Sequence, residues 1–483
     1  MKYQATWAGV VIAESDRCVI VGGVHYFPST DVLPKLLRPV DHRTVCPWKG
    51  KASYFDLDVD GNCLSRAAWC YPNPKSGYEH IAGAIAFSQD VDVAPEESGQ
   101  PSGEETIDQP VLGVEAAFAA AGAAARAGVH ADRDSNGNSA SSEPNEDILR
   151  FLQELPKTEV HVHLEAMIDV DRLWQLISRH PERRILSSRE ELLGRFQVRS
   201  LQDFISLFID VIQPVISSAE DLGLFVESAA DYMRRNTIEY AEVFVAPTKL
   251  LERGIEFEHI VRVLDEGAGR LRREFGLDMR FLVDVSRGFG LENAMRNLEL
   301  TIANPCESVI GIGLGGAEQA SEAATFAPVF ERAREADLHT TAHAGEIVDS
   351  HSIRQAVDVC GAERIGHGLS AMHDPELMQE LGDRKIPVEL CPASNVFTGA
   401  YIHSIAEYPL RLFFDRGIPV SLNTDDPVIF GVELIDEFMS AHEYHGFTRD
   451  ELLALNDNSI NMSFMPEQSK QEMKVRCRNR VGL

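Results

Sequence analysis

Short apolar runs alternate with longer amphipathic segments over residues 146–483. Polar residues bound each run, and segments with helical spacing, such as 220–235 and 323–335, separate most of them. Eight strand-then-helix units in succession predict a (β/α)8 barrel of the TIM type, with extra helices between residues 169 and 235 near the barrel mouth. The expected strands are Thr158–His163, Glu239–Val245, Met279–Val285, Val309–Leu314, His339–His343, Arg364–His367, Val388–Cys391 and Pro419–Leu422.

The pattern changes before residue 146. Residues 1–92 contain short alternating runs such as ASYFDLDV and turn signals such as Asp60-Gly61, which predict a small, mostly β domain. Residues 93–145 are acidic, then alanine-rich, then polar, with too few apolar side chains for a core. We therefore expect three parts: a β domain over 1–92, a flexible linker over 93–145 and the barrel over 146–483.

Composition limits the location and the partners. The 483 residues are 44% hydrophobic and 25% charged, which is ordinary for a soluble globular protein. A net charge of -30 argues against general binding to nucleic acid or anionic membranes, because both need clustered Lys and Arg. The eight cysteines form no C-x-x-C pair, and the chain has neither a signal-peptide pattern nor a run near the ~18 apolar residues of a membrane span. These features predict a cytoplasmic protein and leave its oligomeric state open.

Polar side chains with metal-binding chemistry follow several of the expected strands. His161 and His163 stand two apart at the end of the first strand, so both imidazoles face one side. Active sites of such barrels lie at the C-terminal ends of the strands. Each candidate alone has an ordinary structural explanation, such as a core histidine or a turn aspartate, but their joint placement favours a site. The other candidates at strand ends are His343, Glu346, His367, Asp425 and Asp426.

The residue types favour one zinc ion. Three imidazoles and one carboxylate suit Zn²⁺, which lowers the pKa of a bound water to ~7. Glu346 can then act as a proton donor, and His367 can orient the water or take its proton. Barrels with two metals usually bridge them with a carboxylated Lys after the fourth strand. Here that strand ends in Gly313-Leu314-Gly315-Gly316, which lacks Lys and leaves backbone N–H groups free to approach a planar ligand.

Six motifs in order carry a family resemblance: TEVHVHLE, LGGAE, TAHAGE, RIGHG, ELCPASN and SLNTDDP. They resemble the motifs of the adenosine/adenine deaminase family of the amidohydrolase superfamily. The resemblance covers residues from about 147 to 483, including a closing SFMPEQSKQEM that is similar to the family's C-terminal helix. It implies a hydrolase acting on C–N bonds of cyclic amidines, with one Zn²⁺ per barrel, attack at C6 of a 6-aminopurine and release of ammonia.

The resemblance also implies roles for individual residues. Glu346 would protonate the purine N1, and His367 and Asp426 would position the attacking hydroxide, with Asp426 also near N7. The backbone of Gly316 would contact N3, and His163 would lie beside the substrate. The zinc ligands would be His161, His163, His343 and Asp425.

Two departures concern the sugar side of the substrate. Glu165 stands where nucleoside-specific members usually carry an Asp that meets the ribose. The segment AEVFVAPTK replaces an Arg-Tyr-Ser-Pro-like run of adenosine deaminases. The leading hypothesis is conversion of adenosine or deoxyadenosine to inosine or deoxyinosine in purine salvage. The alternatives are adenine, a modified adenosine such as aminofutalosine, and a non-catalytic purine-binding or scaffold protein. The last would have no need of Glu346 and Asp426 together.

The N-terminal residues resemble a second family. WAGVVIAES, HYFP, TVCPWKGKASY and AAWCYPNP are similar to a small DUF427-like domain that is often labelled nucleotidyltransferase-like. Cys46, Lys49 and Glu14 could form a ligand site there. Equally, Trp48 and its neighbours could belong to the core, with Lys49 in solvent.

Overall fold

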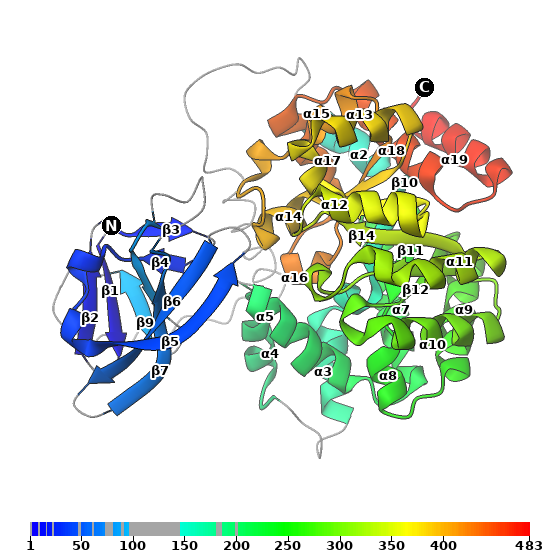
Figure 1. The fold of residues 1–483 in the computed structure, drawn as a ribbon. Coiled ribbons are helices and arrows are strands. Elements are labelled where there is room, and N and C mark those ends of the chain that lie inside the picture. The colour runs from blue at the N-terminus through cyan, green and yellow to red at the C-terminus, as the bar shows by residue number, and fades with distance from the viewer. Residues whose placement is uncertain are drawn as a thin grey trace, which may run out of the picture. The chain divides into compact units, whose positions relative to one another are not determined.

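The computed structural model divides the chain into two compact units, Met1–Val111 and Leu112–Leu483 (Figure 1). The expected linker lies almost wholly outside the described residues, as do Trp48 and Lys49. Among the helices that the structure describes, none is long and apolar enough to cross a membrane. The described residues are 2–7, 10–15, 17–21, 24–46, 50–59, 62–72, 81–87, 91–95, 145–179, 186–198 and 201–483.

Eight parallel strands of the second unit form one sheet in chain order, β10 to β17. The sheet closes where the His163 N–H donates to the Asp425 carbonyl at 2.9 Å and the Asp425 N–H donates to the His161 carbonyl at 3.2 Å. The expected barrel is therefore confirmed. Its strands are β10 (Lys157–His163), β11 (Ile238–Val245), β12 (Asp278–Asp284), β13 (Val309–Leu314), β14 (His339–Ala344), β15 (Arg364–His367), β16 (Val388–Leu390) and β17 (Val420–Leu422).

Helices surround the strands (Figure 1). In α9 (Phe257–Phe275), the buried side chains Ile260, Leu264 and Leu271 recur at helical spacing and face the barrel. The others are α2 (Asn145–Glu154), α7 (Leu222–Arg235), α8 (Thr248–Glu252), α10 (Gly290–Ala303), α11 (Ala327–Glu335), α12 (Ser350–Arg354), α13 (Pro375–Arg384), α14 (Pro392–Thr398), α15 (Leu410–Asp415), α16 (Pro427–Phe430), α17 (Leu434–His445), α18 (Arg449–Met462) and α19 (Glu467–Arg480).

Extra helices follow β10, as the sequence predicts. Phe204 in one of them stacks on Phe430 of α16 with ring centroids 5.6 Å apart. Because α16 directly follows Asp425 and Asp426, these helices lie near the barrel mouth. They are α3 (Val170–Arg179), α4 (Arg189–Arg195), α5 (Leu201–Ser206) and α6 (Gln213–Val215).

The N-terminal unit is mostly β, as expected. Its described strands form three antiparallel sheets, with the orders β2-β1-β9, β3-β4 and β5-β6-β7-β8. Because β9 pairs with β1, the β unit continues past residue 92 to Pro95. Glu14 is partly exposed and pairs with Lys2 at 2.6 Å. The strands are β1 (Tyr3–Trp7), β2 (Val10–Ser15), β3 (Val19–Val21), β4 (Val24–Tyr26), β5 (Leu37–Cys46), β6 (Gly50–Val59), β7 (Asn62–Cys70), β8 (Ile85–Phe87) and β9 (Asp92–Pro95).

Candidate active site at the barrel mouth

Four side chains from different strand ends meet at the mouth of the barrel. His161, His343, His367 and Asp425 each offer one ligand atom, and these atoms all lie within 4.8 Å of one another. His163 joins them, because its Nε2 lies 3.2 Å from Asp425 Oδ1. The barrel thus brings together all five of these residues, which are up to 264 positions apart in the chain (161 to 425).

The cluster fits a divalent metal ion. His161 is fully buried, and His343 and Asp425 are each 6% exposed. Among the described residues, the buried His161 Nε2 and His343 Nδ1 have no hydrogen-bond partner. Unpaired buried nitrogens are costly, and coordination to a cation would satisfy such atoms. Imidazoles with a carboxylate are also the donor set that divalent transition metals favour.

A buried ion-pair network holds the His161 ring in place. His161 Nδ1 lies 2.6 Å from Glu389 Oε2, and Arg364 Nε donates to Glu389 Oε1 at 2.5 Å. Burial alone would raise the pKa of Glu389, but Arg364 and His161 lower that pKa to about 2. The ionised carboxylate therefore accepts the Nδ1 proton of His161 and leaves Nε2 free to face the cluster, as outer partners of metal-binding histidines do.

Asp425 and Asp426 have opposite electrostatic roles. Asp425 has a positive φ of 64°, which is uncommon for a non-glycine residue, and its Oδ2 accepts a hydrogen bond from Ser394 Oγ at 2.7 Å. Burial and the neighbouring Asp425 raise the pKa of Asp426 well above its usual range. The pair can thus hold one charged and one neutral carboxyl group side by side.

Glu346 lies three residues beyond His343 and enters the same site. Burial and the nearby Asp425 raise the pKa of Glu346 to about 8. Thr398 Oγ1 lies 2.8 Å from the Ser394 carbonyl and 3.1 Å from Glu346 Oε1. Because a carbonyl can only accept, the Thr398 hydroxyl can give its proton to Ser394 and accept one from a protonated Glu346. The surroundings therefore favour a neutral carboxylic acid at neutral pH.

A chain of hydrogen bonds fixes the tautomer of His367. The Cys391 backbone bonds to the Tyr408 oxygen, and the Tyr408 hydroxyl donates to Asn395 Oδ1 at 3.0 Å. Asn395 Nδ2 therefore faces His367 Nδ1, 3.1 Å away, and donates to it. A neutral His367 must then carry its proton on Nε2, which lies 3.8 Å from Glu346 Oε2. A nitrogen that carries a proton can donate a hydrogen bond but cannot bind a metal.

Two further carboxyl groups line the side next to His163. Glu165 is 2% exposed, and its Oε1 accepts from the Ala246 N–H at 2.9 Å. Its buried Oε2 has no hydrogen-bond partner in the part of the chain that the structure describes. Burial raises the pKa of Asp284 to about 6, and its Oδ1 accepts from the Gly315 N–H at 3.0 Å. The Gly315 N–H is therefore not free for a ligand, contrary to the sequence-based expectation. Gly316 is exposed at the mouth with a φ of 79°.

Several residues of the site carry no role in the sequence-based prediction. The motif ELCPASN supplies partners for three predicted residues: Glu389 for His161, Ser394 for Asp425 and Asn395 for His367. Glu389 could have been identified from the sequence, because it is an acidic residue inside a short apolar run. A charged side chain in such a run must be paired when the strand is buried.

Glu437 of α17 gives a prediction for stability against pH. This residue is 1% exposed, its Oε1 accepts from the Ala393 N–H at 2.9 Å, and burial raises its pKa to about 8. The folded chain keeps a proton that the unfolded chain releases at about pH 4.3. The stability contributed by this group is thus complete below about pH 4.3 and is lost as pH rises toward 8, at about 1.4 kcal/mol per unit.

Glu437→Gln keeps the acceptor and cannot ionise. We expect its unfolding free energy to exceed that of the parent chain by an amount that grows between pH 5 and 8. Denaturant unfolding of the metal-free proteins at several pH values measures this difference. A constant difference across the range would show that Glu437 is ionised in the folded chain.

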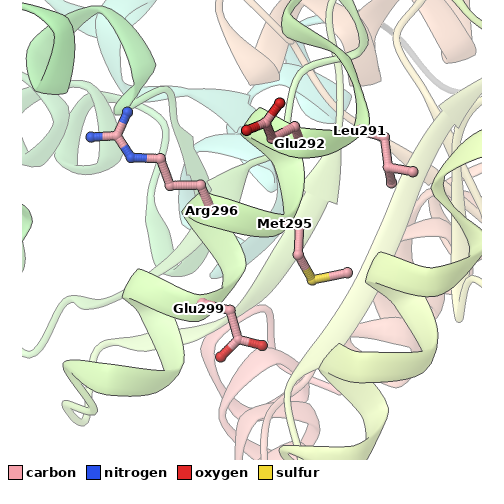
Figure 2. A pocket seen from close by; sticks show the side chains of 5 residues that line it. All are labelled: Leu291, Glu292, Met295, Arg296 and Glu299. Carbon is pink, nitrogen blue, oxygen red and sulfur yellow. The ribbon is translucent and has the colours of Figure 1, made fainter.

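A separate surface pocket lies on α10. Figure 2 shows its lining residues, Leu291, Glu292, Met295, Arg296 and Glu299, all from that helix. None of them belongs to the histidine and carboxylate cluster. The pocket therefore adds no group to the candidate active site.

Known proteins are similar to this chain in sequence. Residues 156–479 match the family model for adenosine deaminase, and residues 2–97 match the model for a domain of unknown function, DUF427. The chain is 32% identical to an aminodeoxyfutalosine deaminase of Streptomyces coelicolor, over 67% of this chain and 84% of the relative. It is 30% identical to an adenine deaminase of Rhodopseudomonas palustris, over 67% of this chain and 94% of the relative.

Solved structures agree with the sequence comparisons. An adenine deaminase from Arthrobacter aurescens superposes with a TM-score of 0.64 at 26% identity, covering 68% of this chain and all (100%) of that one. The N6-methyl-AMP deaminase of Arabidopsis thaliana gives a TM-score of 0.61 at 26% identity, covering 68% of this chain and 98% of that one. The chain therefore belongs to the adenosine deaminase family and is a hydrolase acting on C–N bonds of cyclic amidines.

Proposed function

We propose that the barrel is a zinc-dependent deaminase of 6-aminopurine nucleosides, with adenosine and deoxyadenosine as its substrates. Water adds at C6 of the purine, the 6-amino group leaves as ammonia, and a 6-oxopurine nucleoside remains. One observation carries this proposal: a neutral Glu346 lies beside a buried cluster of histidines and Asp425 that fits a divalent ion. When bound, Zn²⁺ would supply Lewis acidity and activate water at neutral pH.

We assign the ligands to His161, His163, His343 and Asp425 rather than to His367. The tautomer of His367 supports this choice, because its Nε2 carries a proton when Asn395 donates to Nδ1. His163 has its Nε2 within 3.2 Å of Asp425 Oδ1. Both histidines of the pair at the end of β10 can therefore share one ion with Asp425.

The remaining residues then have distinct roles. Glu346 donates its proton to the purine N1, which makes C6 more electrophilic. His367 orients the attacking water through its Nε2 proton. A cation bound beside Asp426 would favour the ionised form of this carboxyl group, which can then take a proton from that water and give it to the leaving amine. Gly316 contacts N3 through its backbone, since the exposed residue lies at the mouth with no side chain to block the ring.

The substrate side next to His163 favours a nucleoside over a nucleotide. Glu165 Oε2 is buried and has no partner among the described residues, and Asp284 interacts electrostatically with both Glu165 and His163. Two carboxyl groups can accept hydrogen bonds from sugar hydroxyls but would repel a phosphate. Nucleoside 5′-monophosphates should therefore be poor substrates.

A second candidate is a nucleoside modified at its sugar end, such as aminodeoxyfutalosine. The relative from Streptomyces coelicolor, at 32% identity, is a deaminase of that substrate. The purine chemistry is the same for both candidates, so the same catalytic residues would serve. Only the contacts around Glu165 would differ.

A panel of substrates assayed by ammonia release tests these proposals. The panel contains adenosine, deoxyadenosine, adenine, AMP and aminodeoxyfutalosine, with protein that carries one zinc ion per chain. We expect the highest kcat/KM for adenosine and deoxyadenosine and at least about 100-fold less for AMP, since like charges in a site cost several kcal/mol. Higher kcat/KM for aminodeoxyfutalosine would establish the second candidate. No ammonia from any compound would refute the substrate class.

A further inference from the structure

The loop that carries Glu346 is held by one buried carboxylate. Residues 345–348 connect β14 to α12, and their four consecutive N–H groups all point to the side chain of Glu318. Gly345 donates to Oε1 at 2.5 Å, and Glu346, Ile347 and Val348 donate to Oε2 at 3.1, 3.0 and 3.2 Å. A carboxylate with several N–H donors is a strong and geometrically narrow arrangement.

Glu318 itself has little freedom. It belongs to a short 3-10 helix, η9 (Glu318–Ala320), and is 4% exposed. The Ser352 hydroxyl, on the other side of the loop, donates to Oε1 at 2.6 Å. This fifth hydrogen bond ties the carboxylate to α12 as well, so the loop and the helix after it share one anchor.

Arg287 also holds this region, as a donor to backbone carbonyl groups. This residue is 2% exposed, and it donates to the His343 carbonyl at 2.6 Å and to the Ser321 carbonyl at 2.9 Å. Ser321 follows the short helix that carries Glu318. Arg287 therefore connects the strand end with His343 to the segment with Glu318.

The side chain of Glu346 depends on this backbone. Among the described residues, its carboxyl group has one hydrogen-bond partner, Thr398 Oγ1 at 3.1 Å, whereas its N–H is fixed by Glu318. Gly345 is packed so closely that an added Cβ would lie 2.4 Å from Ser370 Oγ, and its φ is 73°. The loop thus has one well-packed conformation, and Glu346 extends from its middle.

We propose that Glu318 is a positioning residue for the deamination, acting through Glu346. Its carboxylate fixes the backbone of 345–348 and so keeps the Glu346 acid in reach of the purine N1. The proposal rests on the proposed function for its effect on turnover, and on the hydrogen bonds alone for its effect on the loop. Misplacing a catalytic group by about 1 Å can cost 10²-fold in rate.

The test is a double-mutant cycle between Glu318→Gln and Glu346→Gln. Glu318→Gln would direct an NH₂ group at backbone N–H donors and so release part of the loop. In the parent chain, we expect Glu318→Gln to lower kcat by about 10- to 100-fold, with KM and bound zinc nearly unchanged. In the Glu346→Gln chain, the same change should lower kcat by less than about 3-fold, because the group it positions is already inactive. Equal losses of kcat in both backgrounds would overturn the proposal.

Glu322→Gln is the matched control. This substitution also replaces an acid with its amide in the connection between β13 and α11. Glu322 is exposed and accepts a hydrogen bond from Gln355 rather than from the loop. We expect its kcat to equal that of the parent chain. If Glu318→Gln does not fold, Glu318→Asp keeps the charge but shortens its reach, and it should give the same pattern with a smaller loss.

Hydrogen exchange separates this proposal from the proposed function. The amides of 345–348 should exchange faster in Glu318→Gln than in the parent or in Glu322→Gln, while the amides of β14 keep their protection. This result is independent of any substrate. If no 6-aminopurine is turned over but the four amides lose protection, the proposed function fails and the anchoring by Glu318 stands. Unchanged exchange at 345–348 would refute the anchoring itself.

Discussion

Glu346→Gln should lower kcat for adenosine by about 10²- to 10⁴-fold while one metal ion per chain is retained. The amide has the size of the acid and can keep the contact with Thr398, but it has no acidic proton for the purine N1. The loss should appear in kcat, with KM little changed, because the proton is transferred in the transition state and not on binding. Steady-state kinetics and metal analysis of the purified variant measure both quantities.

The pH dependence of kcat gives the same residue a second test. The pKa of Glu346 is raised to about 8, and the reaction needs its protonated form. The active fraction of the parent enzyme should therefore fall as pH rises above about 8, and the small kcat of Glu346→Gln should lack that decline.

Glu363→Gln serves as the control for the change from acid to amide. Glu363 is exposed and lies 3.2 Å from His339 at the start of β14, the end of the strand opposite to the mouth. Its variant should keep the kcat and the pH profile of the parent. Normal turnover by Glu346→Gln would remove Glu346 as the proton donor.

The second large effect concerns the metal. His161→Ala should leave purified protein with far less than one metal ion per chain and with no measurable turnover. The variant loses a proposed metal ligand that is fully buried, and it leaves Glu389 without the imidazole that pairs with its carboxylate. Glu389→Gln should weaken metal affinity by only about 10- to 100-fold, as is typical for the partner of a ligand. Metal analysis after dialysis against a weak chelator ranks the variants.

His163 and His367 distinguish the proposed ligand set from the alternative one. We expect His163→Ala to lose the metal, and His367→Ala to keep it while kcat falls about 10²-fold or more. His351→Ala, on α12 and outside the cluster, is the control and should keep both metal and turnover. Metal loss in His367→Ala with retention in His163→Ala would reverse the assignment.

Local patterns were sufficient for the strands of the barrel. β13 and β15 begin and end where the sequence predicts. The strand β13 is an unbroken apolar run, as is typical of buried parallel strands, whereas β15 has polar residues at both ends, Arg364 and His367. The boundary near Cys391 was less accurate. The strand β16 ends at Leu390, and Cys391 caps α14, because Pro392 is well suited to the first turn of a helix.

The residues of the candidate site could be predicted from sequence, but their pairings could not. The sequence alone indicated the candidates at the strand ends, because histidine or aspartate stands at the end of a short apolar run in each case. They are His161, His163, His343, His367 and Asp425. The pairing of Glu389 with His161 spans 228 positions, and that of Asn395 with His367 spans 28. The periodicity of apolar residues along the chain does not indicate which polar residue will form such a distant pair.

Residue types and spacings within single elements were enough to predict the barrel, the candidate histidines and carboxylates of the site, and the family. How those side chains are held depends on contacts between elements that are distant in the chain. Closure of β10 against β17 places Asp425 beside His161 and His163, and Glu318 and Arg287 fix the loop of Glu346 from other strand ends. The reason is physical: hydrogen bonds and ion pairs in a buried site depend on distances in space, which chain closure sets and local sequence does not.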